Sequence, residues 1–310
     1  MKRRRFIHTS LLSSAAIVTG CAAQSSTLVA KQKLIADPFN LNFAPHLGMF
    51  KHHAGEDPID QLNFMADQGF RAFEDNNMRT RDIAMQEKMA SVMVNRGIEM
   101  GVFVAHQIYW KVPTLAKGDD ESRAEFLDYI TKAVDVAKRV NAKWMTVVPG
   151  HVDLRQDMGY QTTHVTETLK RASAILEPHE LTMVLEPLNF RNHPGLFLTK
   201  AAQAYQICKA VDSPSCKILF DIYHQQIQEG NLIPNIELTW DEIAYIQIGD
   251  NPGRNEPTSG EINYKNVFKF IHDQGFQGVL GMEHGNSEEG IEGEKKVIEA
   301  YRAVDAMSKN

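Results

Sequence analysis

Cysteine is scarce in this sequence of 310 residues. It occurs only at Cys21, Cys208 and Cys216, which is too few for a framework of disulfide bonds. Cys208 and Cys216 could pair in an oxidising compartment, but we expect them to be two buried free thiols. A composition that is 43% hydrophobic is sufficient for a large core.

Basic charge is limited as well. The net charge is −6, and it becomes −10 without the four basic residues Lys2 and Arg3–Arg5 near the N-terminus. A protein that binds nucleic acid needs a basic surface, so this balance argues against a nucleic-acid partner. The chain also has no low-complexity segment and no composition shift that would indicate a second domain.

Long apolar runs are missing from the N-terminal region, which instead resembles an export signal. The stretch from Leu11 to Val18 is too short to span a bilayer as a mature helix. The preceding run Arg3–Ile7 resembles a twin-arginine signal. Val18–Cys21 resembles a lipobox, in which the cysteine is lipidated after cleavage. An ordinary basic N-terminus with a chance cysteine is the alternative.

These motifs predict three parts of the chain. Residues 1–20 would be a signal peptide of the twin-arginine lipoprotein type, and residues 21–38 a tether of small and polar residues. Residues 39–310 would be the folded domain. In this hypothesis Cys21 carries a lipid, the protein is exported to the periplasmic face, and its membrane contact is limited to that anchor.

From Leu41 onward, apolar runs alternate with amphipathic stretches. The predicted strands lie at 41–50, 71–76, 98–106, 143–150, 181–189, 218–220, 243–246 and 278–285. The predicted helices lie at 58–68, 82–95, 121–140, 160–176, 200–211, from 225, at 264–274 and from 288. Strict alternation predicts an α/β fold with a parallel sheet, and eight units predict its closure into a single (β/α)₈ TIM barrel. The long aromatic loop at 107–120 suits a lid over an active site.

Four of the predicted strands end in oxygen-bearing side chains, and these are Glu186, Asp221, Gln247 and Glu283. Their spacings of 35, 26 and 36 residues correspond to about one strand–helix unit each. In a barrel, the C-terminal strand ends share one rim, where the chemistry lies. An oxygen-only ligand set suits Mg²⁺ or Mn²⁺ and leaves roughly two octahedral positions for an α-hydroxycarbonyl. A single Asp or Glu is usually a solvated or capping residue, so the prediction rests on the set of four.

Other polar residues near the rim are candidates for binding substrate. They are His224, Arg254, Arg191 and His151. A guanidinium can hold a carboxylate through two hydrogen bonds, so either arginine could bind an anionic substrate. The histidines His46, His106 and His151 also end or interrupt strands, but a loop histidine is more often solvated. Asp250 follows the same strand as Gln247.

The second half of the chain carries a family resemblance. LEPLNFRNHPGLFL, FDIYHQQ, IQIGDNPGRNEPTSGEINY and the strand ending at Glu283 resemble hydroxypyruvate isomerase, within the xylose isomerase-like barrel superfamily. The likeness is dense from Val184 to Glu283, and the first half matches mainly in architecture. The chain departs from the family in FEDNNM after the second strand, in EHGNSEE after the eighth, and in the export signal.

The resemblance implies a reaction and residue roles. Glu186, Asp221, Gln247 and Glu283 would ligate a divalent metal, while Glu186 and Glu283 would also move protons. His224 and Arg254 would contact substrate. The implied reaction interconverts an α-hydroxyaldehyde and an α-hydroxyketone through an enediolate, with a hydroxypyruvate- or tartronate-semialdehyde-like substrate.

Several alternatives stay open. The same site could epimerise or dehydrate a keto-sugar, and nothing in the sequence separates these reactions. An exported sugar-binding lipoprotein without turnover is a further alternative. An abasic-site endonuclease of a related barrel would need many more histidines and a basic DNA-binding face. For the isomerase, epimerase, dehydratase and binding-protein interpretations we expect a small keto-acid or sugar as ligand, and a homo-oligomer stays open as a further partner.

The export hypothesis predicts two distinct defects. Replacing Arg3 and Arg4 with Lys should leave precursor in the cytoplasm, because the export machinery recognises the paired guanidinium groups. Cys21→Ser should release the mature domain from membranes, because it removes the thiol that takes the lipid. Cell fractionation and mass spectrometry of the N-terminus measure both effects. A soluble wild-type protein that still begins at Met1 would contradict the hypothesis.

Overall fold

The computed structural model describes residues 36–305. The predicted signal peptide, Cys21 and most of the tether lie outside the described residues. Within the described part of the chain, no helix is long and apolar enough to cross a membrane. The strands in chain order are β1 (Asn42–Ala44), β2 (Ala72–Phe73), β3 (Glu99–Met100), β4 (Trp144–Val147), β5 (Thr182–Leu185), β6 (Cys216–Asp221), β7 (Ile243–Gln247) and β8 (Val279–Gly281).

The strands pair in parallel and in the order expected of a barrel. One sheet has the order β1-β8-β7-β6-β5-β4, and β2 pairs with β3 in a second. A parallel bridge between Val104 and Thr146 joins the segment after β3 to β4. The amide of Glu74, just after β2, donates to the carbonyl of Pro45, just after β1 (3.1 Å). The predicted TIM-barrel fold is confirmed, and all C-terminal strand ends therefore face one rim.

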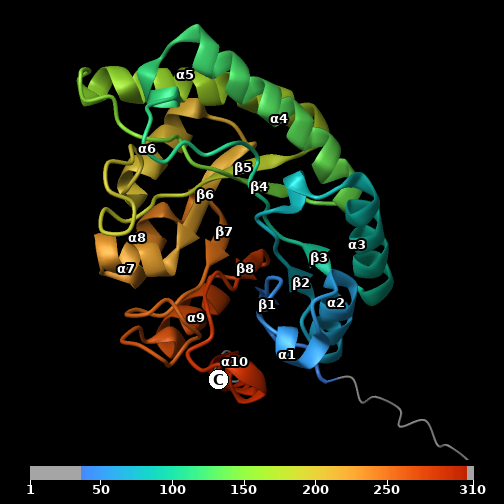
Figure 1. The fold of residues 1–310 in the computed structure, drawn as a ribbon. Helices are drawn as coiled ribbons and strands as arrows, with labels where there is room; N and C mark the ends of the chain where they lie inside the picture. Colours follow the sequence, from blue (N-terminus) through green and yellow to red (C-terminus); the bar gives the residue numbers. More distant parts are fainter. Residues whose placement is uncertain (1–35, 306–310) are drawn as a thin grey trace, which may run out of the picture. The chain divides into compact units, whose positions relative to one another are not determined.

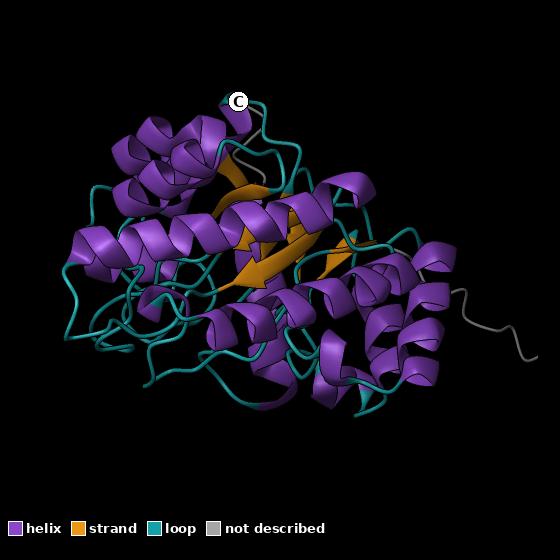
Figure 2. Cartoon of the chain, turned by 90° about the horizontal axis from the view of Figure 1, so that it is seen from above, coloured by secondary structure: helices purple, strands orange, loops and turns teal. Residues whose placement is uncertain are grey.

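Helices surround the strands, as Figures 1 and 2 show. They are α1 (Lys51–Ala54), α2 (Pro58–Asp67), α3 (Ile83–Arg96), α4 (Asp120–Val140), α5 (Met158–Leu176), α6 (Ala201–Val211), α7 (Ile222–Gln228), α8 (Leu232–Thr239), α9 (Tyr264–Asp273) and α10 (Gly290–Asp305). Aspartate side chains cap the first turns of α2 to α5 by accepting from backbone amides, and these are Asp57, Asp82, Asp119 and Asp157.

The structure corrects two of the predicted element boundaries. The predicted strand at 41–50 ends at Ala44, because Pro45 lacks the amide proton that a central strand needs, and α1 follows a turn. The helix predicted from Gln225 begins at Ile222, because the carboxylate of Asp221 accepts from the amide of His224 (3.0 Å) and caps that helix. Cys208 and Cys216 are buried free thiols, as predicted.

The interior of the barrel is filled by a small cluster of buried side chains from nearly all strands. Its members are Ala44, Ala72, Val102, Val184, Leu219, Tyr245 and Val279. Tyr245 is the largest of them, and Trp144 packs against the cluster with its ring centroid 5.8 Å from that of Tyr245. The barrel is therefore a packed core with its polar chemistry confined to the rim.

The end of the chain is tied to its beginning by a buried carboxylate. Glu294 of α10 is fully buried and accepts from the backbone amides of His52 and His53 in α1 (2.7 and 3.0 Å). It also contacts Nδ1 of both histidine rings. Phe50, the residue before α1, offers no side-chain cap, so Glu294 supplies one from a helix 242 residues away. Figure 1 shows α1 and α10 side by side.

Loss of this carboxylate should destabilise the barrel. We expect Glu294→Ala to lower the free energy of unfolding by about 3 kcal/mol, because it leaves buried donors without an acceptor. Glu292→Ala, an exposed change in the same helix, should cost less than about 0.5 kcal/mol. Urea unfolding measures both, and equal losses in the two variants would contradict the role given to Glu294.

Candidate functional site

Three buried side chains that can ligate a metal ion meet at the rim. Ligand atoms of Glu186, Asp221 and His224 all lie within 4.8 Å of one another. Glu186 directly follows β5, Asp221 ends β6, and His224 lies in the first turn of α7. The strand register places Leu185 opposite Ile218, so the neighbouring strands bring both carboxylates to the same end of the sheet. The predicted convergence of Glu186 and Asp221 is thus present in the structure.

The orientation of His224 follows from its hydrogen bonds. Its Nδ1 accepts from the backbone amide of Asn189 (3.3 Å), so the proton of the neutral ring is on Nε2. Burial, with the positive charge of Arg254 adding to it, lowers the pKa of His224 to about 3, and the ring is neutral at pH 7. Nε2 lies 3.9 Å from Glu186 and 3.7 Å from Asp221 and has no hydrogen-bond partner among the described residues. It is a donor directed at the cluster, which suits a substrate oxygen better than a metal.

Arg254 connects two of the predicted ligands. Its Nη2 lies 3.0 Å from Oδ2 of Asp221 and 2.5 Å from Oε2 of Glu283, and its Nε donates to the backbone carbonyl of Glu283. The guanidinium also lies over the ring of Tyr223, 4.9 Å from its centroid. Asn76, in the loop after β2, donates to the other carboxylate oxygen of Glu283 (2.9 Å). Glu283 is therefore held between β2 and the loop that carries Arg254.

That loop is held from within by Asp250. This carboxylate is fully buried and accepts from the backbone amides of Asn251, Gly260 and Ile262 at 2.8 to 3.0 Å. Its role is structural, since it fixes the segment that delivers Arg254 to the cluster.

The electrostatics of the cluster are dominated by burial. Burial raises the pKa of Glu186, and the carboxylates of Glu283 and Asp221 raise it further. For Arg254, burial lowers the pKa, but the neighbouring carboxylates of Glu283 and Asp221 outweigh it, and the net shift is upward. When Glu186, Asp221 and Glu283 are all ionised, they carry more negative charge than Arg254 offsets, and this excess favours the binding of a cation.

Gln247 completes the predicted ligand set at the end of β7. Its side chain is buried, and its Oε1 has no hydrogen-bond partner among the described residues. An unpaired buried oxygen normally costs free energy, so its retention points to a ligand. Glu186, Asp221, Gln247 and Glu283 together offer an oxygen donor set that fits Mg²⁺ or Mn²⁺.

The sequence prediction missed Glu74. It follows β2, and its pKa is raised by burial, with the carboxylate of Glu283 adding to the effect. Tyr245 and Gln247 donate to it from β7. Glu74 also follows a strand, but β2 has only the two residues Ala72 and Phe73, which is too short a run to identify Glu74 by its position as the predicted ligands were identified.

Two other predicted residues lie apart from the cluster. Arg191 is exposed, and His151 directs Nδ1 at the carbonyl of Val152 (2.8 Å). In residues 36–305, no hydrogen bond or ion pair joins either of them to Glu186, Asp221 or Glu283. Of the two arginines considered as anion-binding groups, only Arg254 contacts the acidic cluster.

The long loop after β3 reaches toward the site. Trp110 stacks on His193 with ring centroids 5.0 Å apart, and His193 lies 5.4 Å from His224. Trp110 is nearly half exposed. The loop thus covers His224 from the solvent side, in agreement with its predicted position over the rim.

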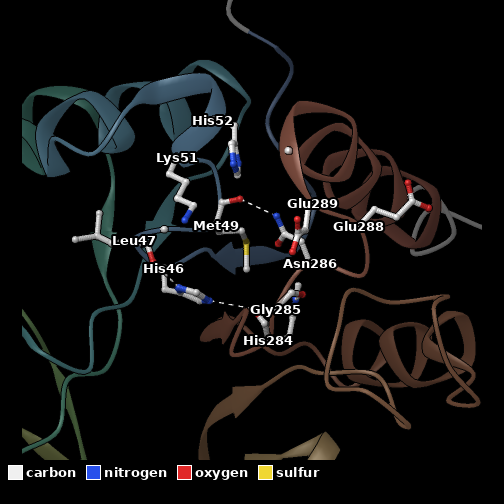
Figure 3. A pocket seen from close by; sticks show the side chains of 12 residues that line it. His46, Leu47, Met49, Lys51, His52, His284, Gly285, Asn286, Glu288 and Glu289 are labelled. Carbon is white, nitrogen blue, oxygen red and sulfur yellow. Dashed lines mark hydrogen bonds between the residues drawn. The ribbon is translucent and has the colours of Figure 1, made fainter.

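Two cavities open at the rim beside the cluster. One of about 220 Å³ is lined by Glu74, Asn76 and Glu283 among others. Another of about 400 Å³ lies between α1 and the start of α10, where Figure 3 shows Lys51 and Glu289 on its opposite sides. Both are lined by His46 and Leu47, which follow β1. Neither cavity is lined by Glu186 or Asp221, so the site is located by its side chains rather than by a cavity.

Comparison with known proteins gives consistent matches. A family model described as xylose isomerase-like TIM barrel matches residues 62–305. Hydroxypyruvate isomerase of Escherichia coli strain K12 is 32% identical over 160 residues, which cover 52% of this chain and 62% of that protein, less than two thirds of its length. The 2-oxo-tetronate isomerase of Cupriavidus necator is 30% identical over 244 residues, 78% of this chain and 92% of that protein. The crystal structure of an AP endonuclease of family 2 from Brucella melitensis has a TM-score of 0.71 and 25% identity, with 82% of this chain and 96% of that chain covered.

The two arginines should differ sharply in their effect on stability. In metal-free protein, Arg254→Gln should lower the free energy of unfolding by about 3 kcal/mol at pH 8, because it leaves buried carboxylates without their cation. Without Arg254 the pKa of Glu186, already raised, rises further. Glu186 can then take up a proton in the folded state at pH 5, so the loss of stability should be smaller there than at pH 8. Urea unfolding in chelator at both pH values measures the change.

Arg191→Gln is the matched control, since Arg191 is an exposed arginine in the loop after β5. It should alter stability by less than about 0.5 kcal/mol at either pH. A pH-independent loss for Arg254→Gln would argue against a role in charge compensation.

Proposed function

This chain belongs to the xylose isomerase-like TIM barrel family, and on this premise we propose that it is a divalent-metal-dependent isomerase. It interconverts an α-hydroxyaldehyde and an α-hydroxyketone. The observation that carries the proposal is the buried cluster of Glu186 and Asp221, with Arg254 and the Nε2 proton of His224 directed at it. The names of the E. coli and C. necator relatives support an isomerase, and the substrate is part of the proposal.

Four residues would hold the metal, namely Glu186, Asp221, Gln247 and Glu283. A bound Mg²⁺ or Mn²⁺ would supply the positive charge that makes an enediolate accessible from a weakly acidic C–H group. The donor set of three carboxylates and an amide oxygen is consistent with these ions, and the unpaired Oε1 of Gln247 supports its inclusion.

The chain's own residues would move the protons. Glu186 follows β5 and Glu283 follows β8, on different parts of the ring, and both lie near Arg254 and Asp221. One carboxylate removes the proton next to the carbonyl, and the other returns a proton to the neighbouring carbon, while the proton of the substrate hydroxyl passes to the former carbonyl oxygen. Return to the neighbouring carbon is isomerisation, whereas return to the other face of the same carbon is epimerisation.

His224 and Arg254 would orient the substrate. The Nε2 proton of His224 donates to a substrate oxygen, because it has no hydrogen-bond partner in the described structure. Arg254 binds a substrate carboxylate, which fits a keto-acid such as hydroxypyruvate. Trp110 and His193 cover this end of the site and limit the access of water.

A second candidate substrate class is longer. The two cavities that share His46 and Leu47 provide room beside Glu283 for a substrate of four or more carbons. The alignment with 2-oxo-tetronate isomerase, which covers nearly all of that protein, is in line with this size. A keto-sugar epimerase or dehydratase and a non-catalytic sugar-binding lipoprotein remain the alternatives.

Export to the periplasmic face with a lipid on Cys21 is a separate proposal, which rests on the N-terminal motifs.

The proton carriers provide the sharpest test of activity. Metal-depleted protein should be inactive on hydroxypyruvate, 2-oxo-tetronate and keto-sugars, and Mn²⁺ or Mg²⁺ should restore turnover of one class.

Glu186→Gln and Glu283→Gln should each reduce turnover on the order of 10²–10⁴-fold, because an amide oxygen can ligate but cannot accept a proton. Mn²⁺ binding measured by calorimetry should remain detectable in both.

Deuterated water separates ligands from proton carriers. The wild type should incorporate solvent deuterium at the carbon next to the carbonyl, and neither glutamate variant should. Glu299→Gln, an exposed change on α10, is the control and should behave as wild type. If both variants exchange at the wild-type rate, the glutamates are ligands only. Full activity in strong chelator would refute the metal site, and a metal-binding protein that neither exchanges nor turns over any substrate would support the binding-protein alternative.

A further inference from the structure

Gln247 is an amide in a set of carboxylates, and only one of its two terminal atoms can bind a cation. We propose that Glu74 is a positioning residue that holds the Gln247 amide with its oxygen toward the cation site. This inference rests on the proposed function, since it takes Gln247 as a metal ligand. It assigns a task to Glu74, which the strand-end pattern did not identify.

The contacts of Gln247 define the two ends of its amide. Nε2 lies 3.5 and 3.4 Å from the two carboxylate oxygens of Glu74. Oε1 points away from that donor contact and is buried without a partner in the described structure. The amide nitrogen has two protons and no lone pair to offer, whereas the oxygen accepts or ligates. The acceptor beside Nε2 therefore determines which atom faces the cluster.

Such control is necessary because the two ends of a glutamine amide are alike in shape. A rotation of 180° about the last side-chain bond would exchange oxygen and nitrogen at almost no steric cost. The NH₂ group would then face the cation site, and one ligand would be lost. Carboxylate ligands do not have this weakness, since both of their oxygens can bind. A fixed acceptor beside Gln247 removes the ambiguity, as second-layer partners of metal ligands generally do.

Glu74 is itself held firmly. The hydroxyl of Tyr245, two residues before Gln247 on β7, donates to Oε2 of Glu74 (2.9 Å), and Tyr245 is fully buried in the barrel interior. Two glycines leave the space for this pair. A Cβ atom on Gly281 would lie 1.9 Å from Oε2 of Glu74, and one on Gly101 would lie 2.4 Å from the Tyr245 hydroxyl. The carboxyl group of Glu74 is thus held by the hydroxyl of Tyr245, in space that the absence of a side chain at Gly281 and at Gly101 leaves open.

The role does not require a particular charge on Glu74. A carboxyl group keeps at least one accepting oxygen whether it is ionised or protonated. Oε2 can accept from Tyr245 and Gln247 together. Glu74→Gln also keeps an accepting oxygen, whereas Glu74→Met fills a similar volume with no acceptor that could hold the amide.

The experiment measures Mn²⁺ affinity by calorimetry in the full chain. We expect Glu74→Met to weaken binding about 10- to 100-fold, the usual cost of losing such a partner, and Glu74→Gln to stay within about threefold of wild type. Asp75→Asn is the matched control, because Asp75 is also a buried carboxylate after β2 but pairs with Arg81. It should leave the Mn²⁺ affinity unchanged.

A second background distinguishes orientation from packing. In Gln247→Glu both terminal atoms are oxygens, so no orienting partner is needed. Adding Glu74→Met to the Gln247→Glu variant should not weaken Mn²⁺ binding. The second substitution also removes the negative charge of Glu74 from beside the new carboxylate at position 247. If Glu74→Met weakens binding equally in both backgrounds, Glu74 is a packing residue or a ligand, and the inference is wrong.

The remaining outcomes are also decisive. Unchanged affinity in Glu74→Met would overturn the inference while leaving the proposed function intact. A wild type that binds no Mn²⁺ would overturn both. Thermal melting of each variant checks folding, and if Glu74→Met does not fold, Tyr245→Phe takes its place. That variant removes only the hydroxyl that fixes Glu74, and it should weaken Mn²⁺ binding several-fold in wild type but not with Gln247→Glu.

Discussion

Negative charge gathered in a buried place is the constraint on which this site depends. Glu186 and Asp221 are both buried, and Glu283 reaches the same guanidinium as Asp221. Ionised carboxylates this close repel one another strongly where water is excluded. Two responses are visible in the structure, namely the contact with Arg254 and the raised pKa of Glu186, whose first cause is burial. A divalent cation would be the third, and it would relieve the repulsion most completely.

The surroundings of the cluster are organised to keep its polar groups in place. Asp250 gathers three backbone amides and so fixes the loop that carries Arg254. Asn189 fixes the tautomer of His224 from the loop after β5. Beneath the rim, Tyr245 joins the apolar barrel interior to Glu74 and through it to Gln247. Arg254, His224 and Gln247 are thus each held by a partner outside the cluster.

Much of this could be predicted from local patterns. Glu186, Asp221, Gln247 and Glu283 each follow an apolar run, and a barrel brings all such positions to one rim because its strands are parallel. The first half of the chain was less informative. β2 has only two residues, so the run before Glu74 is too short to mark it as a strand end of the same kind. Proline at position 45 shortened the first strand for a reason visible in the sequence, yet the apolar composition of 41–50 concealed it.

Local sequence patterns were enough to predict the alternation of strands and helices, the rim positions of the candidate oxygen ligands and the family to which the chain belongs. These depend on periodicity and on residue type, which are local properties. Which side chains meet depends on the three-dimensional fold and could not be predicted from these patterns. Asn76 reaches Glu283 across 207 residues, and Gln247 reaches Glu74 across 173. Arg191 and Arg254 both lie in polar loops next to proline or glycine. The loop of Arg254 is folded around the buried carboxylate of Asp250, and its arginine donates to Asp221 in the cluster. Loop conformation and side-chain direction set these contacts, because they depend on packing between segments that are distant in the chain.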